Sequence, residues 1–398
     1  MRAILLTAGM IMLFIAEVLK SYFTMPFAGS FENDALAIGY FFSNNIVWLR
    51  ILAVLLIAYP LYSLVKNKKI KPLFPVLLLL AGYVAVYYYL NVYVLPEEVY
   101  QPIKVKTFAS KKANKISSDK MVIGVNINGQ AKAYPLQIIG YHHHITDTVN
   151  GVPIIVTYCT VCRSARVFDA EVDGQTTHFR LVGMNKYNAL FKDDRTDSWW
   201  QQATGKAVAG PLKNKVLREI PSQQVTLSSW LKRHPDALVM QPDTNYLAAY
   251  RLTQDDKAFF RAKYSQHDSA AFKAKSMVIG IVQNNVAKAY DFDRLNRNKI
   301  IEDSVNRLPL LITVEADNAS VHTLNRNVNG VTHVFEKTDK PNLLKDVATQ
   351  SIWNLEGTCI EGRLEGTQLE EVQSYVETWQ SWSEFHPGTA EYEDAGEK

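Results

Sequence analysis

Apolar residues are concentrated in the first hundred positions of the chain, where three long stretches carry few polar residues. They run from Ala3 to Leu19, from Ile46 to Val65 and from Leu73 to Leu90. A helix needs about 20 apolar residues to cross the hydrocarbon core of a bilayer, and the second and third stretches meet this length. The pattern predicts transmembrane helices at about 3–23, 46–65 and 73–93, and a lipid bilayer as a partner.

The charges between these stretches predict their orientation. Lysines 66, 68, 69 and 71 separate the second stretch from the third, whereas Ser21 to Asn45 carries Glu32 and Asp34 and no Lys or Arg. Positively charged loops remain in the cytoplasm. The expected location is therefore the inner (cytoplasmic) membrane, with several spans and with everything after Leu95 outside the cytoplasm.

The first stretch has a second interpretation. Met1-Arg2, a short apolar run and the small residues of Phe27-Ala28-Gly29-Ser30 also fit a cleaved signal peptide. A retained helix is favoured, because two more spans follow and Lys20 is unusual near a cleavage region. Both interpretations leave the C-terminal region outside.

The pattern changes after a polar linker at 96–114. Short apolar and β-branched runs alternate with turn pairs such as Asn128-Gly129 and Asp173-Gly174, which is typical of strands. One short helix is expected at Ser228–His234, before Pro235. The expected strands are Met121–Asn126, Ala131–Pro135, Pro153–Tyr158, Ala165–Asp169 and Thr176–Val182.

This β-rich region repeats itself. Met121-Val-Ile-Gly recurs as Met277-Val-Ile-Gly, at an offset of 156 (277 − 121), and Ser229-Trp230 recurs as Ser381-Trp382. Ordered matches of this kind indicate a duplication. The predicted fold class is N-terminal transmembrane α-helices followed by a mainly β (α+β) soluble region made of two tandem homologous domains. The expected boundaries are a membrane domain at 1–95, domains at 115–245 and 270–392, and a second linker at 246–269.

Composition narrows the functional classes. The 398 residues carry a net charge of only +4, and the C-terminal part has no basic stripe with interleaved aromatics, so nucleic acid is not an expected partner. The cysteines, at 159, 162 and 359, are too few for a disulfide scaffold.

The two copies differ in their chemistry. The first holds Tyr158-Cys159-Thr-Val-Cys162-Arg163 where the second holds Val314-Glu315-Ala-Asp-Asn318-Ala319. The first also holds Tyr141-His142-His143-His144 where the second holds Arg297-Asn298-Lys299-Ile300. Both clusters are absent from the second copy together, which indicates that the cysteines and histidines act at one site.

Thiolate with imidazole suits copper or zinc. We therefore predict a metal site with Cys159, Cys162, His142 and His144 as candidate ligands, the two histidines facing one way if the run is a strand. The C-x-x-C motif is expected in a turn between strands, which disfavours a thioredoxin-type site at the start of a helix. A redox-active pair and an inert disulfide beside a surface histidine run remain alternatives. Further candidate pocket residues are His143, Asp147, Arg163, Arg195, Asp197 and Gln202, with a surface loop as the alternative for the last three.

The first copy resembles a known family. Its motifs include Val156-Thr-Tyr-Cys-Thr-Val-Cys162, Arg166-Val-Phe-Asp169 and Asp194-Arg-Thr-Asp-Ser-Trp-Trp-Gln201. With these it resembles the bacterial and archaeal domain of unknown function DUF3179, and the second copy is similar to a degenerate member. The resemblance implies that the family's His-Glu-Ile-Val-Asn-Asp stretch falls on His142 to Asp147, with His143 in place of the usual Glu and Thr146 in place of Asn. It supports His142 but implies no reaction.

The sequence thus predicts a membrane-anchored extracytoplasmic protein that binds copper or zinc. Two alternatives remain open. One is a thiol–disulfide or metal-dependent oxidoreductase, and the other is a non-catalytic membrane-tethered interaction module with a structural disulfide.

Overall fold

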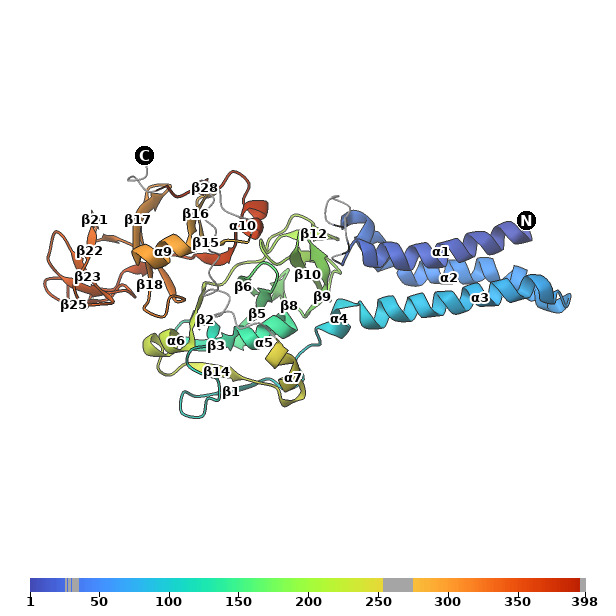
Figure 1. Cartoon of the computed structure of the whole chain (residues 1–398), viewed down its shortest axis with the longest axis horizontal. Coiled ribbons are helices and arrows are strands. Elements are labelled where there is room, and N and C mark those ends of the chain that lie inside the picture. Colours follow the sequence, from blue (N-terminus) through green and yellow to red (C-terminus); the bar gives the residue numbers. More distant parts are fainter. Residues whose placement is uncertain (26, 28–29, 31–35, 253–274, 394–398) are drawn as a thin grey trace. The chain divides into compact units, whose positions relative to one another are not determined.

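The computed structural model describes residues 1–25, 27, 30, 36–252 and 275–393 (Figure 1). The chain forms two compact units. Residues Met1–Pro102 and Thr177–Val216 make one, here called the helical unit. Residues Ile103–Thr176 and Leu217–Lys398 make the other, the sheet unit. These units cut across the expected domain boundaries, because 177–216 lies inside the expected first domain. Most of the expected linker 246–269, and residues 270–274, lie outside the described residues.

Three helices of the helical unit are long and apolar enough to cross a membrane, as expected. The second begins ten positions earlier than expected, so Leu36–Asn45 is helical rather than part of a loop. Glu32, Asp34 and the Ala28-Gly29 pair of the alternative cleavage region lie outside the described residues. The helices are α1 (Arg2–Tyr22), α2 (Leu36–Lys66) and α3 (Ile70–Tyr88), with a π-helical turn η1 (Tyr89–Tyr93) and a short α4 (Pro96–Val99) after them.

A polar network joins the three long helices. Glu17 of α1 is fully buried and accepts hydrogen bonds from Arg50 Nε of α2 at 2.7 Å, Tyr83 Oη of α3 at 3.1 Å and Asn91 Nδ2 of η1 at 3.0 Å. Close packing accompanies it, since a Cβ at Gly9 would lie 2.8 Å from the carbonyl oxygen of Ala53. The first apolar stretch is therefore packed as one helix of a bundle.

The helical unit also contains one four-stranded sheet, in the order β12-β11-β10-β9. Its Trp199 is buried against Leu36 and packs edge-on against Tyr40, with ring centroids 5.2 Å apart, so the start of α2 lies on this sheet. Gly183, at φ +152°, lets the backbone of Thr24 approach, because a Cβ there would meet the Thr24 oxygen at 2.1 Å. The strands are β9 (Phe179–Asn185), β10 (Asn188–Asp193), β11 (Trp199–Gln201) and β12 (Ala207–Ala209).

The first half of the sheet unit, residues 103–176 and 217–252, begins with a five-stranded sheet in the order β1-β14-β3-β2-β13. Its strands are β1 (Thr107–Ala109), β2 (Met121–Ile127), β3 (Gln130–Pro135), β13 (Ser222–Thr226) and β14 (Leu238–Gln241). Its helices are α5 (Leu136–His142), α6 (Leu227–Arg233), η2 (Thr244–Tyr246) and α7 (Leu247–Leu252).

A three-stranded antiparallel sheet β4-β5-β6 completes this half. The expected strands and the expected helix at 228–234 are confirmed, although 176–182 is divided between two short elements. The remaining strands are β4 (His144–Val149), β5 (Val152–Cys159), β6 (Ser164–Asp169), β7 (Glu171–Val172) and β8 (Gln175–Thr176).

The second half, residues 275–393, repeats the order of elements. The series β2-β3-α5-β4-β5-β6 is followed in the same order by β15-β16-α9-β17-β18-β19. One sheet contains β15 (Met277–Gln283), β16 (Val286–Asp291), β27 (Tyr375–Thr378) and β28 (Ala390–Glu391). A second contains β17 (Ile300–Val305), β18 (Leu308–Val314), β19 (Val321–Asn325) and β26 (Glu370–Glu371). A third pairs β20 (Asn327–Val328) with β21 (Val331–Thr332). The others are β22 (Phe335–Lys337), β23 (Leu343–Asp346), β24 (Ile352–Asn354), β25 (Cys359–Glu361), α9 (Phe292–Asn298) and α10 (Trp379–Phe385).

The same close contact secures a helix on each half. A Cβ at Gly124 would lie 2.3 Å from the Trp230 ring, and one at Gly280 would lie 2.2 Å from the Trp382 ring. Only glycine therefore leaves room for each indole on its strand. One hydrophobic core also runs through both halves, with Ile123 and Val156 from the first and Ile279 and Ile312 from the second. The halves are thus packed as one body.

Candidate functional site

The two cysteines of the C-x-x-C motif lie at a tight hairpin turn, as expected. Cys159 ends β5 and pairs with Ser164 at the start of β6, and Arg163 turns the chain with a φ of +59°. Cys159 is 1% exposed and Cys162 is 2% exposed, and no disulfide joins them. The turn therefore holds two buried thiols with two residues between them.

Strand register places one histidine and one arginine on the same face of the sheet as Cys159. Thr157 pairs with His144 on β4 and with Arg166 on β6. Directly paired residues share a face, and so do residues two apart along a strand. His144, Thr157, Arg166 and Cys159 therefore occupy one face, with His144 and Arg166 diagonal to Cys159.

The histidine run is not one strand, so the expected alternation of His142 and His144 is wrong. His142 is the last residue of α5, His143 ends the helix with a φ of +63°, and only His144 belongs to β4. The backbone turns here because the N–H of His143 still bonds to Ile139 while its carbonyl already accepts from Tyr158. The helix end thus separates the three imidazoles.

Each of the first two imidazoles has its own surroundings. His142 is fully buried among aromatic rings, and its Nε2 lies 2.8 Å from the hydroxyl of Tyr250. Burial lowers the pKa of His143 to about 4, so this ring is neutral at physiological pH. His142 is therefore held by tyrosines, and His144 is the histidine that shares a sheet face with Cys159.

A buried ion pair lies on the same face. Arg166 donates to the Glu377 carboxylate at 2.5 Å, and its guanidinium stacks 3.8 Å above the centroid of the Tyr375 ring. Glu219 accepts from the Tyr375 hydroxyl at 2.8 Å. Burial raises the pKa of Glu219, although Arg166 opposes this. One carboxylate oxygen of Glu377 and one of Glu219 are buried with no hydrogen-bond partner.

The segment that carries Glu377 also touches the turn. The N–H of Thr378 donates to the carbonyl of Cys162 at 2.9 Å. Ser381 follows in α10, and its buried Oγ has no hydrogen-bond partner. Residues 375–381 were not predicted as part of the site. The repeat of Ser229-Trp230 as Ser381-Trp382 is the sequence signal that could have drawn attention to this position.

Asp147 is part of a separate polar cluster. It accepts hydrogen bonds from Lys132 at 2.8 Å, Tyr134 at 2.8 Å and Lys106 at 2.9 Å. Burial works against its ionisation, but these donors outweigh burial and lower the pKa of Asp147. The second half has the same arrangement, in which Tyr290 donates to Asp303 at 2.9 Å. Asp147 therefore joins β3 to β4.

The other three pocket candidates belong to the helical unit. Gln202 is buried and accepts from Asn188 at 2.8 Å, and Asp197 forms an ion pair with Lys192. Arg195 lies in a turn in which its N–H donates to the Asp193 carboxylate at 3.1 Å. Arg195 and Asp197 thus lie in the turn between β10 and β11, whereas Gln202 bonds to the first residue of β10, at the other end of this strand pair.

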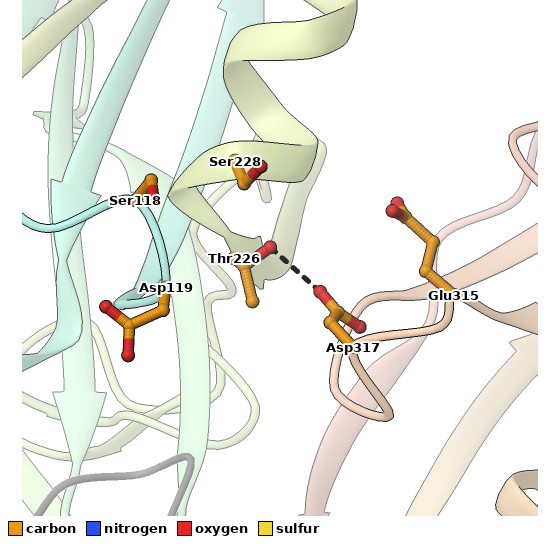
Figure 2. Close-up of a pocket in the computed structure, with 6 residues that line it drawn as sticks. All are labelled: Ser118, Asp119, Thr226, Ser228, Glu315 and Asp317. Carbon is orange, nitrogen blue, oxygen red and sulfur yellow. Dashed lines mark hydrogen bonds between the residues drawn. The ribbon is translucent and has the colours of Figure 1, made fainter.

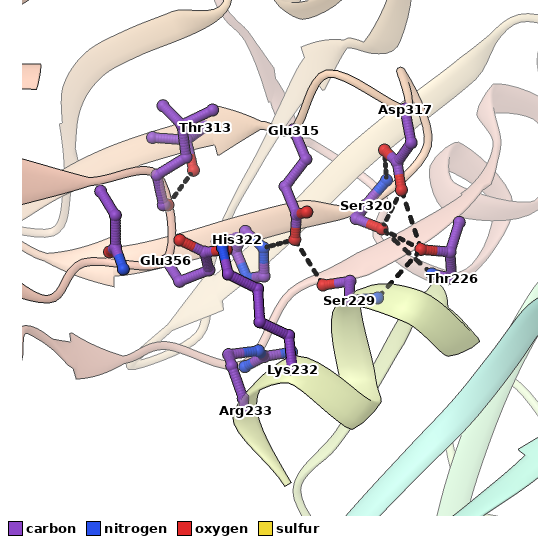
Figure 3. Close-up of polar contacts among 12 residues, drawn as sticks. Thr226, Ser229, Lys232, Arg233, Thr313, Glu315, Asp317, Ser320, His322 and Glu356 are labelled. Carbon is purple, nitrogen blue, oxygen red and sulfur yellow. Dashed lines mark hydrogen bonds and ion pairs between the residues drawn. The ribbon is translucent and has the colours of Figure 1, made fainter. Parts of the chain in front are cut away.

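At the matching turn of the second half, Glu315 stands in place of Cys159 and Asn318 in place of Cys162. Glu315 accepts hydrogen bonds from Ser229 of α6 and, at 2.8 Å, from His322, and both point to its carboxylate in Figure 3. Asp317 accepts from Thr226 at 2.9 Å. A pocket of about 250 Å³ lies here, as Figure 2 shows, lined by Ser118, Asp119, Thr226, Ser228, Glu315 and Asp317. This turn is bonded to the first half.

Across the described residues, no three His, Cys, Asp or Glu side chains are grouped closely enough to hold a metal ion. The four predicted ligands therefore do not form such a group as their side chains stand. Cys159, Cys162 and His144 come from one hairpin and its neighbouring strand, whereas His142 is bonded elsewhere.

Comparisons with known proteins give a family. One family model, DUF3179, described as a protein of unknown function, matches residues 100–389. Comparison with curated proteins and with solved structures finds no match to this chain. The family match runs through both halves of the sheet unit and covers most of the chain. The chain belongs to the DUF3179 family.

Proposed function

We propose that this chain is a membrane-anchored protein whose water-facing region binds a soft metal ion through Cys159 and Cys162. Copper(I) is the preferred candidate and zinc is the second. The observation that carries the proposal is the pair of buried thiols on one tight turn, with no disulfide between them. Soft thiolate ligands select copper(I) and zinc. Binding would release the thiol protons, since the thiolate is the ligand.

Burial favours metal binding over thiol exchange. Reactive cysteines of oxidoreductases lie in partly exposed surroundings, where a partner thiol can reach them. Cys159 and Cys162 are 1% and 2% exposed. A single ion needs far less access than a protein disulfide, so these thiols suit an ion better.

His144 is the proposed third ligand. It shares a sheet face with Cys159 and comes from the neighbouring strand. Zinc in proteins is almost always bound by four ligands, or by three and a water. Two thiolates and one imidazole match the second of these zinc arrangements as well, and copper(I) is named first because thiolate is a soft ligand.

We also propose that the two halves arose by duplication and that only the first kept the site. The repeated order of elements and the paired Gly124–Trp230 and Gly280–Trp382 contacts support this. Glu315 stands where the first half has Cys159, and its carboxylate bonds to α6. The second half has in this view exchanged metal binding for a contact that joins the halves.

The membrane anchor follows from the three apolar helices. The lysine-rich segment between α2 and α3 favours a cytoplasmic position for that loop. The sheet unit would then lie outside the cytoplasm, at the inner membrane. The chain would then bind the proposed metal ion outside the cytoplasm.

The test uses the purified full chain in detergent under reducing conditions. We expect about one copper(I) per chain after reconstitution, and none in C159S/C162S. C359S is the matched control, because Cys359 is also buried but lies on β25. H144A should bind copper(I) more weakly, whereas H142A should change binding less.

Absence of bound copper and zinc from the wild-type chain after reconstitution would contradict the proposal. The reduction potential of the Cys159–Cys162 pair would then decide between the alternatives. A potential near that of thioredoxin, about −270 mV, would indicate a redox pair. A value below about −300 mV would indicate a structural disulfide.

A further inference from the structure

One buried hydroxyl close in sequence to the segment that contacts the C-x-x-C turn makes no hydrogen bond. Ser381 is 3% exposed, and its Oγ has no hydrogen-bond partner. An unpaired buried polar group costs about 1–3 kcal/mol. A buried serine without a partner is therefore a candidate for contact with a bound ligand.

Neighbouring contacts place this segment against the thiol turn. The N–H of Thr378 donates to the carbonyl of Cys162 at 2.9 Å, three positions before Ser381. Glu377 binds Arg166, which shares a sheet face with Cys159. Thr378 of the second half therefore borders the turn of the first half, and Ser381 follows three positions later.

The equivalent contact between α6 of the first half and the β18–β19 turn of the second half shows what a hydroxyl at this position does. Ser229 of α6 is the counterpart of Ser381 of α10, and Glu315 is the counterpart of Cys159. Ser229 donates its hydroxyl proton to the Glu315 carboxylate, as Figure 3 shows. In this pair the acceptor is an anion, supplied by the turn of the other half.

We propose that Ser381 is a positioning residue of the dithiol site, whose hydroxyl donates a hydrogen bond to the thiolate of Cys159 when the metal is bound. This rests on the proposed metal site. A protonated thiol is a weak acceptor, whereas hydrogen bonds to an ionised acceptor are about twice as strong as neutral ones. Groups that bond to metal ligands orient them and tune the metal. The site is then completed by the second half, although that half has no cysteine at its own turn.

The first experiment titrates the full chain with copper(I) against a chromogenic chelator. S381A should bind copper(I) about 10- to 100-fold more weakly, the usual effect of removing a partner of a metal ligand. S381T keeps the hydroxyl and should restore most of the affinity. S229A, at the counterpart position, should bind as the wild type does. Unchanged affinity in S381A, or no rescue by S381T, would overturn the proposal.

The second experiment needs no metal. In S381C, mild oxidation should join the introduced thiol to Cys159 or Cys162, which peptide mapping by mass spectrometry would detect. S229C, treated in the same way, should form no disulfide with either cysteine. If S381C folds but forms no such bond, Ser381 does not border the thiol pair. If the wild-type chain binds no metal, the proposed function fails, and this experiment alone decides the position of Ser381.

Discussion

Arg166 shows how one residue ties the site to the fold. Its charge is buried between strands of both halves, with Glu377 at 2.5 Å and Glu219 at 4.0 Å. Although burial works against it, Glu377 and Glu219 raise the pKa of Arg166, so the guanidinium stays charged. A buried charge of this kind depends on its partner, because removing one member leaves the other uncompensated.

We predict that E377A destabilises the chain by about 3–5 kcal/mol, the usual cost of breaking a buried pair. E371A is the matched control, since Glu371 also pairs across the halves, with Arg233, but is largely exposed. Exposed pairs contribute about 0–1 kcal/mol. Urea unfolding of the full chain in detergent, followed by tryptophan fluorescence, measures both. Equal midpoints for the two variants would show that the buried pair contributes no more than the exposed one.

The hydrogen bonds of Asp147 make the stability of the chain depend on pH. Its folded pKa is lowered by Lys132, Lys106 and Tyr134, below the value of about 3.9 for an unfolded chain. Its contribution is therefore fully present above about pH 4 and is lost as the pH falls through the folded pKa. D147N should be less stable than the wild type at pH 7, and the gap should narrow below pH 4. A gap that is independent of pH in urea titrations would refute this.

At this scale, motifs predicted only part of the site. Cys159, Cys162 and His144 are candidates because the second half lacks them, and they stay a prediction. Glu377 was not predicted, since it lies 211 positions from Arg166 and no local pattern marks a residue whose role is to neutralise a distant charge. Ser381 stood out only as a repeat of Ser229, and a repeat does not show which hydroxyl is bonded.

Among the elements, the three apolar helices are joined by charge as well as by packing. Glu17, Arg50, Tyr83 and Asn91 come from α1, α2, α3 and η1. Polar groups in a bundle of this kind face one another rather than lipid. The network therefore fixes how the helices are rotated about their axes.

We predict that E17L weakens the bundle more than E17L/R50L does. The single change leaves the guanidinium of Arg50 without its carboxylate, whereas the double change replaces a buried pair by apolar side chains. The onset of thermal aggregation of the full chain in detergent should follow the order wild type, double variant, single variant. A double variant no more stable than the single would argue against the pair as the source of the effect.

Element types were easier to predict than element ends. Strands at Met121–Ile127 and Gln130–Pro135 follow from short apolar runs on either side of an Asn-Gly turn. The histidine run was misread because His142 belongs to a helix of seven residues, too short for a clear period. Leu36–Asn45 was read as a loop because transmembrane length, rather than packing on Trp199, set the expected start of α2.

For the whole molecule, the proposed orientation can be tested with two exposed positions. Asn67 lies between α2 and α3, and Ser110 lies after α4. N67C should resist a membrane-impermeant maleimide in intact spheroplasts and react after permeabilisation, whereas S110C should react in both. The native cysteines are buried and give a low background. Labelling of N67C in intact spheroplasts would reverse the proposed topology.

The division into units could not be predicted from sequence. Repeats mark related segments, and they suggested that 177–216 belongs with the rest of the first domain. Trp199 and Gly183 instead contact Tyr40 and Thr24 of the helical unit. Such contacts depend on surfaces that meet only in the folded chain.

This division has a practical consequence. The backbone passes between the units three times, after Pro102, Thr176 and Val216. A cut in the linker near residue 100 would remove one of the three connections and would leave the Trp199 face of β9–β12 without Leu36 and Tyr40. A chain truncated at that point would therefore expose an apolar surface on β9–β12 that the helices cover in the full chain. During synthesis, more than a hundred residues are added after α2 before β9, the first strand of the same unit, is made.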